Sequence, residues 1–148
     1  MTKIRRIPYV PQTRISHVRQ RGEDDCGVAC TAKLADISYA QAKTTLLNHV
    51  GSSSLLTKTK HLRAALDESN IRLGSEVRSS DWNQLLGLGR VLLLSTNYLE
   101  ERGSNWHWCV FDPARHKTPV LDPRNSEPTQ IDRRTKLFSY FLLWRDDA

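Results

Sequence analysis

The fold is decided by one stretch near the N-terminus, which reads Gln20-Arg21-Gly22-Glu23-Asp24-Asp25-Cys26-Gly27-Val28-Ala29-Cys30. The polar turn before Cys26 ends in carboxylates, which are typical of helix N-caps. The residues from Gly27 to Ala35 are mostly small, so a helix formed from them can pack closely against its neighbours. We therefore predict a buried central helix that begins near Cys26.

More helices are predicted in the next sixty residues. Ser38 and Gln41 have the spacing of a capping box, which opens a helix that continues to about His49. Apolar residues on one face predict a third helix over about residues 57–68. A short fourth helix is expected to follow the serines at 79–80 and to end at a glycine.

From residue 90 onward the pattern favours strands. Short apolar runs at 90–96, 106–111 and 119–121 are bounded by turn residues, and a final apolar run covers 137–144. The segment 112–117 between the second and third runs is rich in turn formers, so these two strands should form a hairpin. Helices followed by strands predict an α+β fold, with helices packed on an antiparallel sheet.

Length and composition match one globular domain, with 148 residues, 39% hydrophobic and 26% charged. The longest strongly apolar stretch, Val91 to Leu94, is far shorter than the roughly 18 residues that a membrane span needs. The first ten residues do not have the pattern of a secretory signal. We expect a cytoplasmic protein without a membrane span, and export by a signal-independent route is the alternative.

Charge is concentrated at the N-terminus. The formal net charge is +6, and residues 1–21 contain six basic residues and no acidic one. We predict a basic, solvated N-terminal arm over 1–17, followed by a single domain over 18–148. The arm lacks the interleaved aromatic residues of a single-strand binder, so nucleic acid is not the expected partner. The three cysteines are an odd number and are expected to be reduced.

Four positions have the residue types that acyl transfer needs. A helix N-terminus stabilises a thiolate, so Cys26 is placed as a nucleophile. His107 lies on a predicted strand and can hold the thiolate and protonate a leaving group. Asp122 ends the next strand of the hairpin and can orient that imidazole, whereas its rival Asp112 lies at the far end of the histidine's strand. Gln20 can donate its amide N–H to an oxyanion, together with the backbone N–H of Cys26.

These motifs together resemble the papain-like cysteine peptidases of the bacteriocin-processing, double-glycine-leader type. The resemblance covers about residues 18–123 and rests on the stretch quoted above, on Asn105-Trp106-His107-Trp108-Cys109-Val110 and on Val120-Leu121-Asp122-Pro123. It implies a papain-like fold with Cys26 as nucleophile, His107 as base, Asp122 as orienting acid and Gln20 as oxyanion donor. It also implies a peptide or protein substrate and no cofactor or metal. Transporter-attached members of this family continue into membrane and ATP-binding regions. This sequence has neither region up to Ala148, so we expect a free-standing domain.

Other functions stay open at this point. The same thioester can be resolved by different acceptors, so a papain-like amidase, deamidase or acyltransferase acting on a protein side chain is an alternative. A second class of function is a non-catalytic binding module. Such a module either binds a peptide or holds a structural zinc ion with Cys26, Cys30, His107 and Cys109. The zinc hypothesis leaves Gln20 and Asp122 without a role. The sequence determines neither the substrate nor the oligomeric state.

Overall fold

Helices and an antiparallel sheet build the protein, as the sequence predicts. The computed structural model describes residues 4–11, 14–22, 24–51, 57–99, 105–132 and 135–147. The elements, in chain order, are β1 (Arg5–Pro8), α1 (Cys26–Ala35), α2 (Tyr39–Val50), α3 (Thr59–Asp67), β2 (Arg72–Arg78), α4 (Trp82–Leu88), β3 (Leu92–Leu99), β4 (Asn105–Phe111), β5 (Val120–Leu121) and β6 (Leu137–Asp147). None of the helices in the described ranges is long and apolar enough to cross a membrane.

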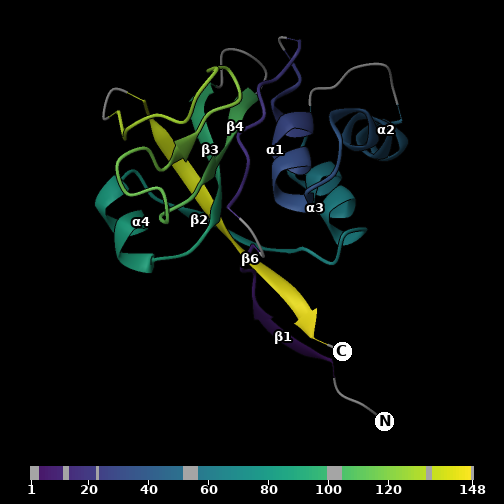
Figure 1. Cartoon of the computed structure of the whole chain (residues 1–148), viewed down its shortest axis with the longest axis horizontal. Helices are drawn as coiled ribbons and strands as arrows, with labels where there is room; N and C mark the ends of the chain where they lie inside the picture. Colours follow the sequence, from purple (N-terminus) through teal and green to yellow (C-terminus); the bar gives the residue numbers. More distant parts are fainter. Residues whose placement is uncertain are drawn as a thin grey trace.

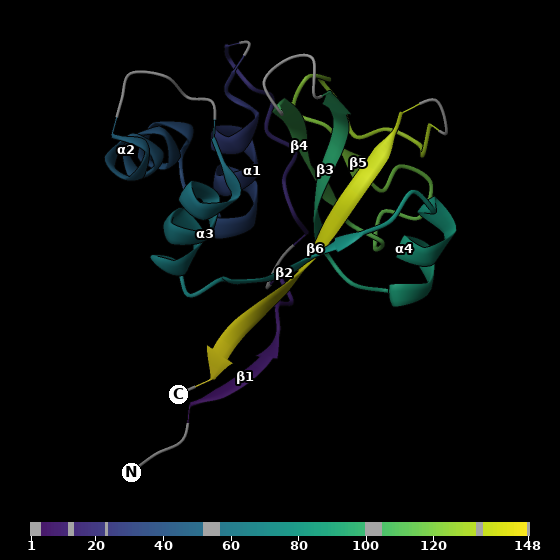
Figure 2. The same ribbon diagram turned by 180° about the vertical axis from the view of Figure 1, so that it is seen from behind.

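The last strand, β6, organises the sheet. The strand order is β1-β6-β3-β4-β5, and β2 also pairs with β6. The first part of β6 pairs with β3 and its last residues, 144–147, pair with β1, all antiparallel. Figures 1 and 2 show β6 running diagonally through the middle of the molecule, with α1, α2 and α3 on one side of the sheet and α4 on the other.

Alternation along the strands supplies a core on each side of the sheet. Leu93 and Val110 belong to the cluster that contains the buried residues of α1, α2 and α3. Leu92 and Leu94, their neighbours in the period-2 pattern, belong to the cluster with Trp82 of α4. Burying one such side chain contributes about 1.5–3 kcal/mol, so the fully apolar run in β3 stabilises both layers.

The helix ends follow their local signals, with one exception. The predicted capping box is present, since the Ser38 hydroxyl accepts from Gln41 N–H and the Gln41 side chain accepts from Ser38 N–H. Helix α4 ends at Leu88 and is C-capped by Gly89, whose φ of +61° favours glycine. Asp25 occupies the N-cap position of α1, but its side chain makes no capping hydrogen bond. The expected carboxylate cap of α1 is therefore wrong.

Two strands have no counterpart in the predicted elements. In β2, exposed and half-buried residues and a register shift between Leu73 and Glu76 mask the alternation of a strand. In the N-terminal segment, β1 pairs with β6, and the side chains of Tyr9 and Ile15 are buried in the core. The expected solvated arm is thus packed on the domain from Arg5 onward in its described part. The boundary between residues 17 and 18 stays a prediction.

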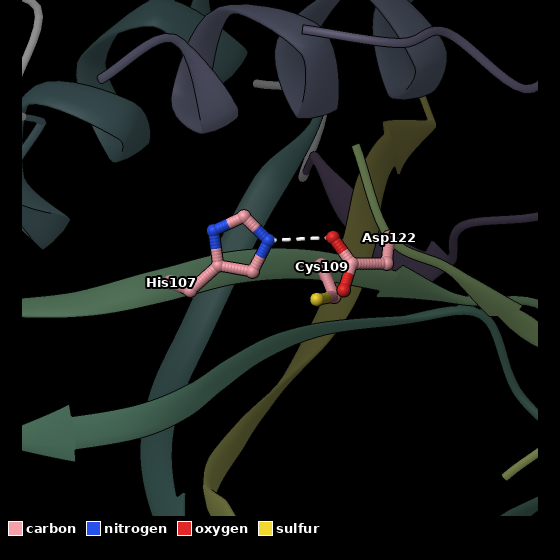
Figure 3. A group of neighbouring side chains, drawn as sticks. All are labelled: His107, Cys109 and Asp122. Atoms are coloured by element: carbon pink, nitrogen blue, oxygen red, sulfur yellow. Dashed lines mark hydrogen bonds and ion pairs between the residues drawn. The ribbon is translucent and has the colours of Figure 1, made fainter. Parts of the chain in front are cut away.

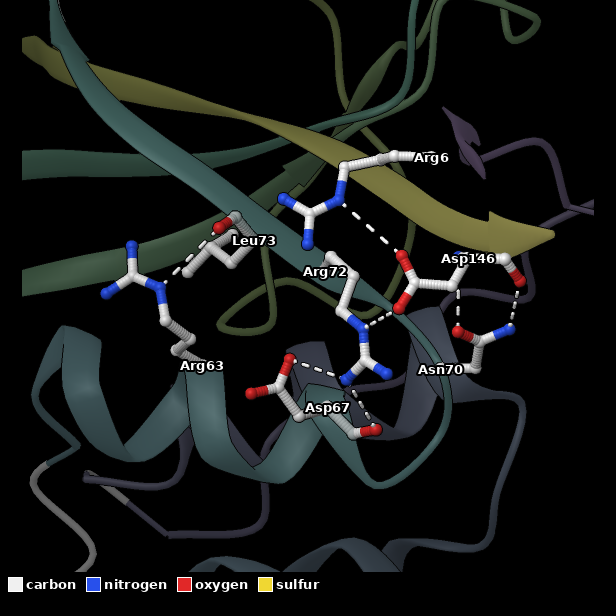
Figure 4. A network of polar contacts seen from close by, with 7 residues as sticks. All are labelled: Arg6, Arg63, Asp67, Asn70, Arg72, Leu73 and Asp146. Atoms are coloured by element: carbon white, nitrogen blue, oxygen red, sulfur yellow. Dashed lines mark hydrogen bonds and ion pairs between the residues drawn. The ribbon is translucent and has the colours of Figure 1, made fainter. Parts of the chain in front are cut away.

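A polar network joins four of these elements where β6 ends (Figure 4). The Arg72 guanidinium on β2 donates to Asp146 Oδ2 of β6 at 2.8 Å and to Asp67 Oδ1 of α3 at 3.0 Å. Arg6 of β1 approaches the same Asp146 carboxylate at 3.6 Å. The hydrogen bond from Arg72 holds the pKa of Asp146 below its usual range. The network thereby connects α3 to the sheet.

Candidate active site

The first residue of α1 is Cys26, and the rest of that helix is largely buried. Cys26 itself is partly exposed, whereas Cys30 and Cys109 are buried. Gly27 permits a close approach beside it, because a Cβ atom there would lie only 2.7 Å from Thr57 Oγ1. The segment that leads into α3 therefore passes directly over the start of α1. This contact explains why glycine follows the cysteine.

His107 and Asp122 meet across the β4–β5 hairpin (Figure 3). Nε2 of His107 lies 2.6 Å from Oδ1 of Asp122, and the other ring nitrogen lies on the edge away from the carboxylate. The same Oδ1 accepts the backbone N–H of Arg124 at 2.9 Å, which fixes the carboxylate after the end of β5. Asp112, the rival orienter, instead accepts from Ala114 N–H. The hairpin therefore brings together the pair that its spacing predicts.

The electrostatics of this pair favour a charged imidazole. Burial lowers the pKa of His107, but hydrogen bonds to Asp122, Cys109 and Cys26 outweigh it and raise the pKa to about 11. Burial raises the pKa of Asp122, yet the hydrogen bond from His107 and its charge leave that pKa below the usual range. At neutral pH the pair is thus an imidazolium and a carboxylate. An imidazolium next to a thiol stabilises the thiolate form.

Cys109 lies in this site, although from the sequence it had a role only in the alternative zinc set. It follows His107 by two residues on β4, so both side chains point to the same face. Cys109, His107 and Asp122 have ligand atoms within 4.8 Å of one another. The Cys109 side chain is buried, and burial raises the pKa of its thiol.

The predicted zinc set is not assembled. Among the described residues, the group that could hold a metal ion consists of His107, Cys109 and Asp122. Neither Cys26 nor Cys30 belongs to it. Cys30 is fully buried in the core around α1, and this burial raises the pKa of its thiol well above the usual value. A set of His107, Cys109 and both helical cysteines is therefore wrong, and a smaller His-Cys-Asp group replaces it as the metal-capable cluster.

Gln20 lies beside the segment that follows Asp122. Its backbone N–H donates to the Pro123 carbonyl at 2.8 Å, which joins the chain before α1 to the chain after β5. Its side-chain amide donates to the Gly22 carbonyl at 2.7 Å. In this structure the Gln20 amide donates to the polar turn before Cys26, so its predicted role as oxyanion donor stays a prediction.

Lys33 is a buried contributor that the sequence pattern did not indicate. Only 4% of it is exposed, and its ammonium donates to the Leu121 carbonyl at 2.9 Å. Leu121 immediately precedes Asp122, so the bond connects α1 to the strand that carries the carboxylate. Lys33 follows Cys26 by seven residues, which puts both on one face of the helix. That spacing was the available signal.

Comparisons with known proteins agree with this fold and go no further. No protein-family profile matches the sequence, and no curated protein sequence matches it. One solved structure, described as a double glycine motif protease from an AMS/PCAT transporter in complex with the leader peptide, is similar with a TM-score of 0.66. The two are 16% identical, and the similarity covers 94% of this chain and 99% of the other. At that identity the likeness shows the fold alone: this chain shares the fold of a peptidase domain.

Proposed function

We propose that this chain is a cysteine peptidase of the papain-like type, with Cys26 as nucleophile, His107 as general acid and base, and Asp122 as orienting acid. The observation that carries the proposal is the 2.6 Å contact between His107 and Asp122, made by a histidine whose pKa is also raised by hydrogen bonding to Cys26. Nε2 is occupied by Asp122, which leaves Nδ1 for the thiolate. This is the arrangement of a base held in one orientation for its nucleophile.

The proposed reaction runs through a thioester. The Cys26 thiolate attacks the carbonyl carbon of the scissile amide and forms a tetrahedral oxyanion. As that intermediate collapses, the carbon–nitrogen bond breaks and His107 passes its proton to the leaving amine. Water then attacks the thioester while His107 accepts a proton from it. The carbon–sulfur bond breaks, the acid product leaves, and the thiolate and imidazolium are restored.

Stabilisation of the oxyanion is assigned to two donors. The backbone N–H of Cys26 lies at the start of α1, where the N-cap residue Asp25 makes no capping hydrogen bond with its side chain. The amide of Gln20 is the second donor, and it would exchange its bond to the Gly22 carbonyl for one to the oxyanion. An oxyanion donor that acts mainly in the transition state raises turnover more than substrate affinity.

The proposed substrate is a peptide. The similar solved structure is a double glycine motif protease with a leader peptide bound, which motivates the first probe. That probe is an internally quenched peptide with Gly-Gly immediately before the bond to be cut. We expect cleavage after the second glycine by the full chain, and no cleavage by Cys26→Ala.

Product analysis separates the proposal from its alternatives. Hydrolysis of the peptide bond yields two peptides and adds one water. A deamidase instead releases ammonia from a side-chain amide, and an acyltransferase joins the acyl group to an added amine. A non-catalytic zinc module would give about one equivalent of zinc by elemental analysis, and chelator would unfold it. Stoichiometric zinc without any acyl transfer would overturn the peptidase proposal.

A further inference from the structure

The carboxylate of Asp25 is held away from the helix that it precedes. Asp25 is the N-cap residue of α1, with φ −94° and ψ 13°, outside the extended region that capping residues adopt. Its Oδ2 accepts a hydrogen bond from the Tyr39 hydroxyl at 2.7 Å. The residue next to Cys26 therefore uses its carboxylate to bind a side chain of α2, and that carboxylate makes no capping hydrogen bond to α1.

Tyr39 is built to keep this contact. Its hydroxyl also accepts the backbone N–H of Arg21 at 3.0 Å, and the Arg21 guanidinium lies 4.4 Å from the centre of its ring. Asp25 and Tyr39 are each only 8% exposed. Tyr39 is the first residue of α2, directly after the capping box at Ser38. Burial raises the pKa of Tyr39 to about 12, so its hydroxyl remains a donor at neutral pH.

We infer that Tyr39 is a positioning residue, which holds the Asp25 carboxylate off the first turn of α1 and so keeps that turn open for the oxyanion. The inference rests on the proposed function. Asp is among the strongest N-cap residues, so a released carboxylate would bind the N–H groups of Gly27 or Val28. It would then add negative charge where the thiolate and the oxyanion form.

The first test compares two buried tyrosines that contact opposite ends of α1. Tyr39→Phe removes the hydroxyl at its N-terminus. Tyr9→Phe is the matched control, because the Tyr9 hydroxyl donates to the Leu34 carbonyl near the C-terminus of the same helix. With the Gly-Gly peptide, Tyr39→Phe should lower kcat about 10- to 100-fold with little change in KM, since an oxyanion donor acts in the transition state. Tyr9→Phe should turn over like the wild type.

The second test asks whether the Asp25 charge causes the damage. Adding Asp25→Ala to Tyr39→Phe removes the carboxylate that would cap the helix, so the double variant should be more active than Tyr39→Phe alone. A merely structural role for Tyr39 would make the second change harmless or harmful, never restorative. Wild-type kcat in Tyr39→Phe, or a double variant no better than Tyr39→Phe, would overturn the inference.

A third readout does not depend on peptidase activity. The rate of iodoacetamide alkylation at Cys26 follows its thiolate population. In Tyr39→Phe the pH profile of this rate should move to higher pH, because a carboxylate at the helix start opposes the thiolate. In Tyr9→Phe it should not move. If the wild type cleaves no peptide, the proposed function fails, and this profile still decides the role of Tyr39: coincident profiles overturn it.

Discussion

Asp122 lies diagonally across from His107 in the β4–β5 hairpin, with 2.6 Å between Oδ1 and Nε2. The hairpin register pairs Val110 with Leu121. Continuing it by one residue sets Asp122 opposite Cys109, and His107 is the next residue of β4 on that face. Diagonal neighbours in an antiparallel pair are within reach of long side chains. The contact and the presence of Cys109 beside it therefore have one cause, the register of two short strands.

The orienting acid can be identified by a comparison of two aspartates. His107→Ala should lower turnover of the Gly-Gly peptide by about 100- to 10,000-fold, the usual contribution of a general acid and base. Asp122→Asn should cost less, because the residue orients the imidazole without transferring a proton. Asp112→Asn should turn over near the wild-type rate. Steady-state kinetics on folded variants measure all three, and a damaging Asp112→Asn with a silent Asp122→Asn would reverse the assignment.

Cys26 should be the first of the three thiols to be alkylated. It is partly exposed at a helix start, whereas Cys30 and Cys109 are buried and burial raises the pKa of both their thiols. Limiting iodoacetamide at about pH 6 should therefore label Cys26 selectively, as read by peptide mass mapping. Cys26→Ser should take up almost no label until the chain is unfolded. Equal labelling of all three thiols in the native protein would contradict the assignment of the nucleophile.

Stability should depend on pH through His107. The pKa of His107 is about 11 in the folded chain, well above the ordinary histidine value. Between about pH 6.5 and 11 the folded state holds a proton that the unfolded state has lost, so the contribution is complete below about pH 6.5 and falls as pH rises. The free energy of unfolding should decline by at most about 1.4 kcal/mol per pH unit from this group.

Chemical denaturation of the wild type and of His107→Gln at several pH values measures this contribution. Glutamine keeps a donor for Asp122 but does not titrate, so groups common to both proteins cancel in the difference. The difference in unfolding free energy should shrink as the pH rises. Parallel curves from about pH 6 to 9 would show that His107 carries no extra proton in the folded state.

The parts of the fold that were predictable are those set by neighbours in sequence. The capping box at Ser38, the apolar run in β3 and the hairpin after His107 depend on short-range spacing, and each lies where expected. Strand β2 was missed because its edge is stabilised from outside, where the Arg63 guanidinium donates to the carbonyl groups of Leu73 and Gly74. This support comes from a residue of helix α3 and leaves no pattern in the sequence of the strand itself.

The site shows the same division. The choice of Asp122 over Asp112 could be predicted, because it depends only on the spacing of two strands and the turn between them. The state of Asp25 depends on Tyr39, which is fourteen residues away on another helix. A terminal carboxylate in a polar turn is ordinarily an N-cap, and the alternative hydrogen bond becomes visible only when α2 is in place. Tertiary contacts thus override the local preference at the residue next to the nucleophile.

Arg72 should be important for stability although it is remote from the site. It connects α3, β2 and β6 through Asp67 and Asp146 (Figure 4), so Arg72→Met should lower the denaturation midpoint. Arg19→Met, at an exposed arginine, is the matched control. Because Arg72 depresses the pKa of Asp146, their contribution is present above about pH 4 and is lost as pH falls through the lower, folded-state pKa. Arg72→Met should therefore lose less stability on acidification, and identical acid profiles would contradict this linkage.

Gln20 offers the sharpest separation of catalysis from peptide or zinc binding, since only an oxyanion gives its amide a transition-state role. Gln20→Ala should lower turnover about 100- to 1000-fold while the alkylation of Cys26 and the midpoint of unfolding stay near wild type. Gln20→Glu should be at least as damaging, because it places an acceptor where the developing negative oxygen needs a donor.

A peptide aldehyde ending in Gly-Gly tests the same donor without turnover, since its adduct with Cys26 carries a tetrahedral oxygen. The aldehyde should bind Gln20→Ala more weakly than the wild type. In Gln20→Ala the Gly22 carbonyl loses the hydrogen bond from the Gln20 amide, and water can replace that bond. Wild-type turnover and wild-type aldehyde affinity in Gln20→Ala would overturn the oxyanion role of Gln20. The Cys26 N–H would then be the one proposed donor that is retained.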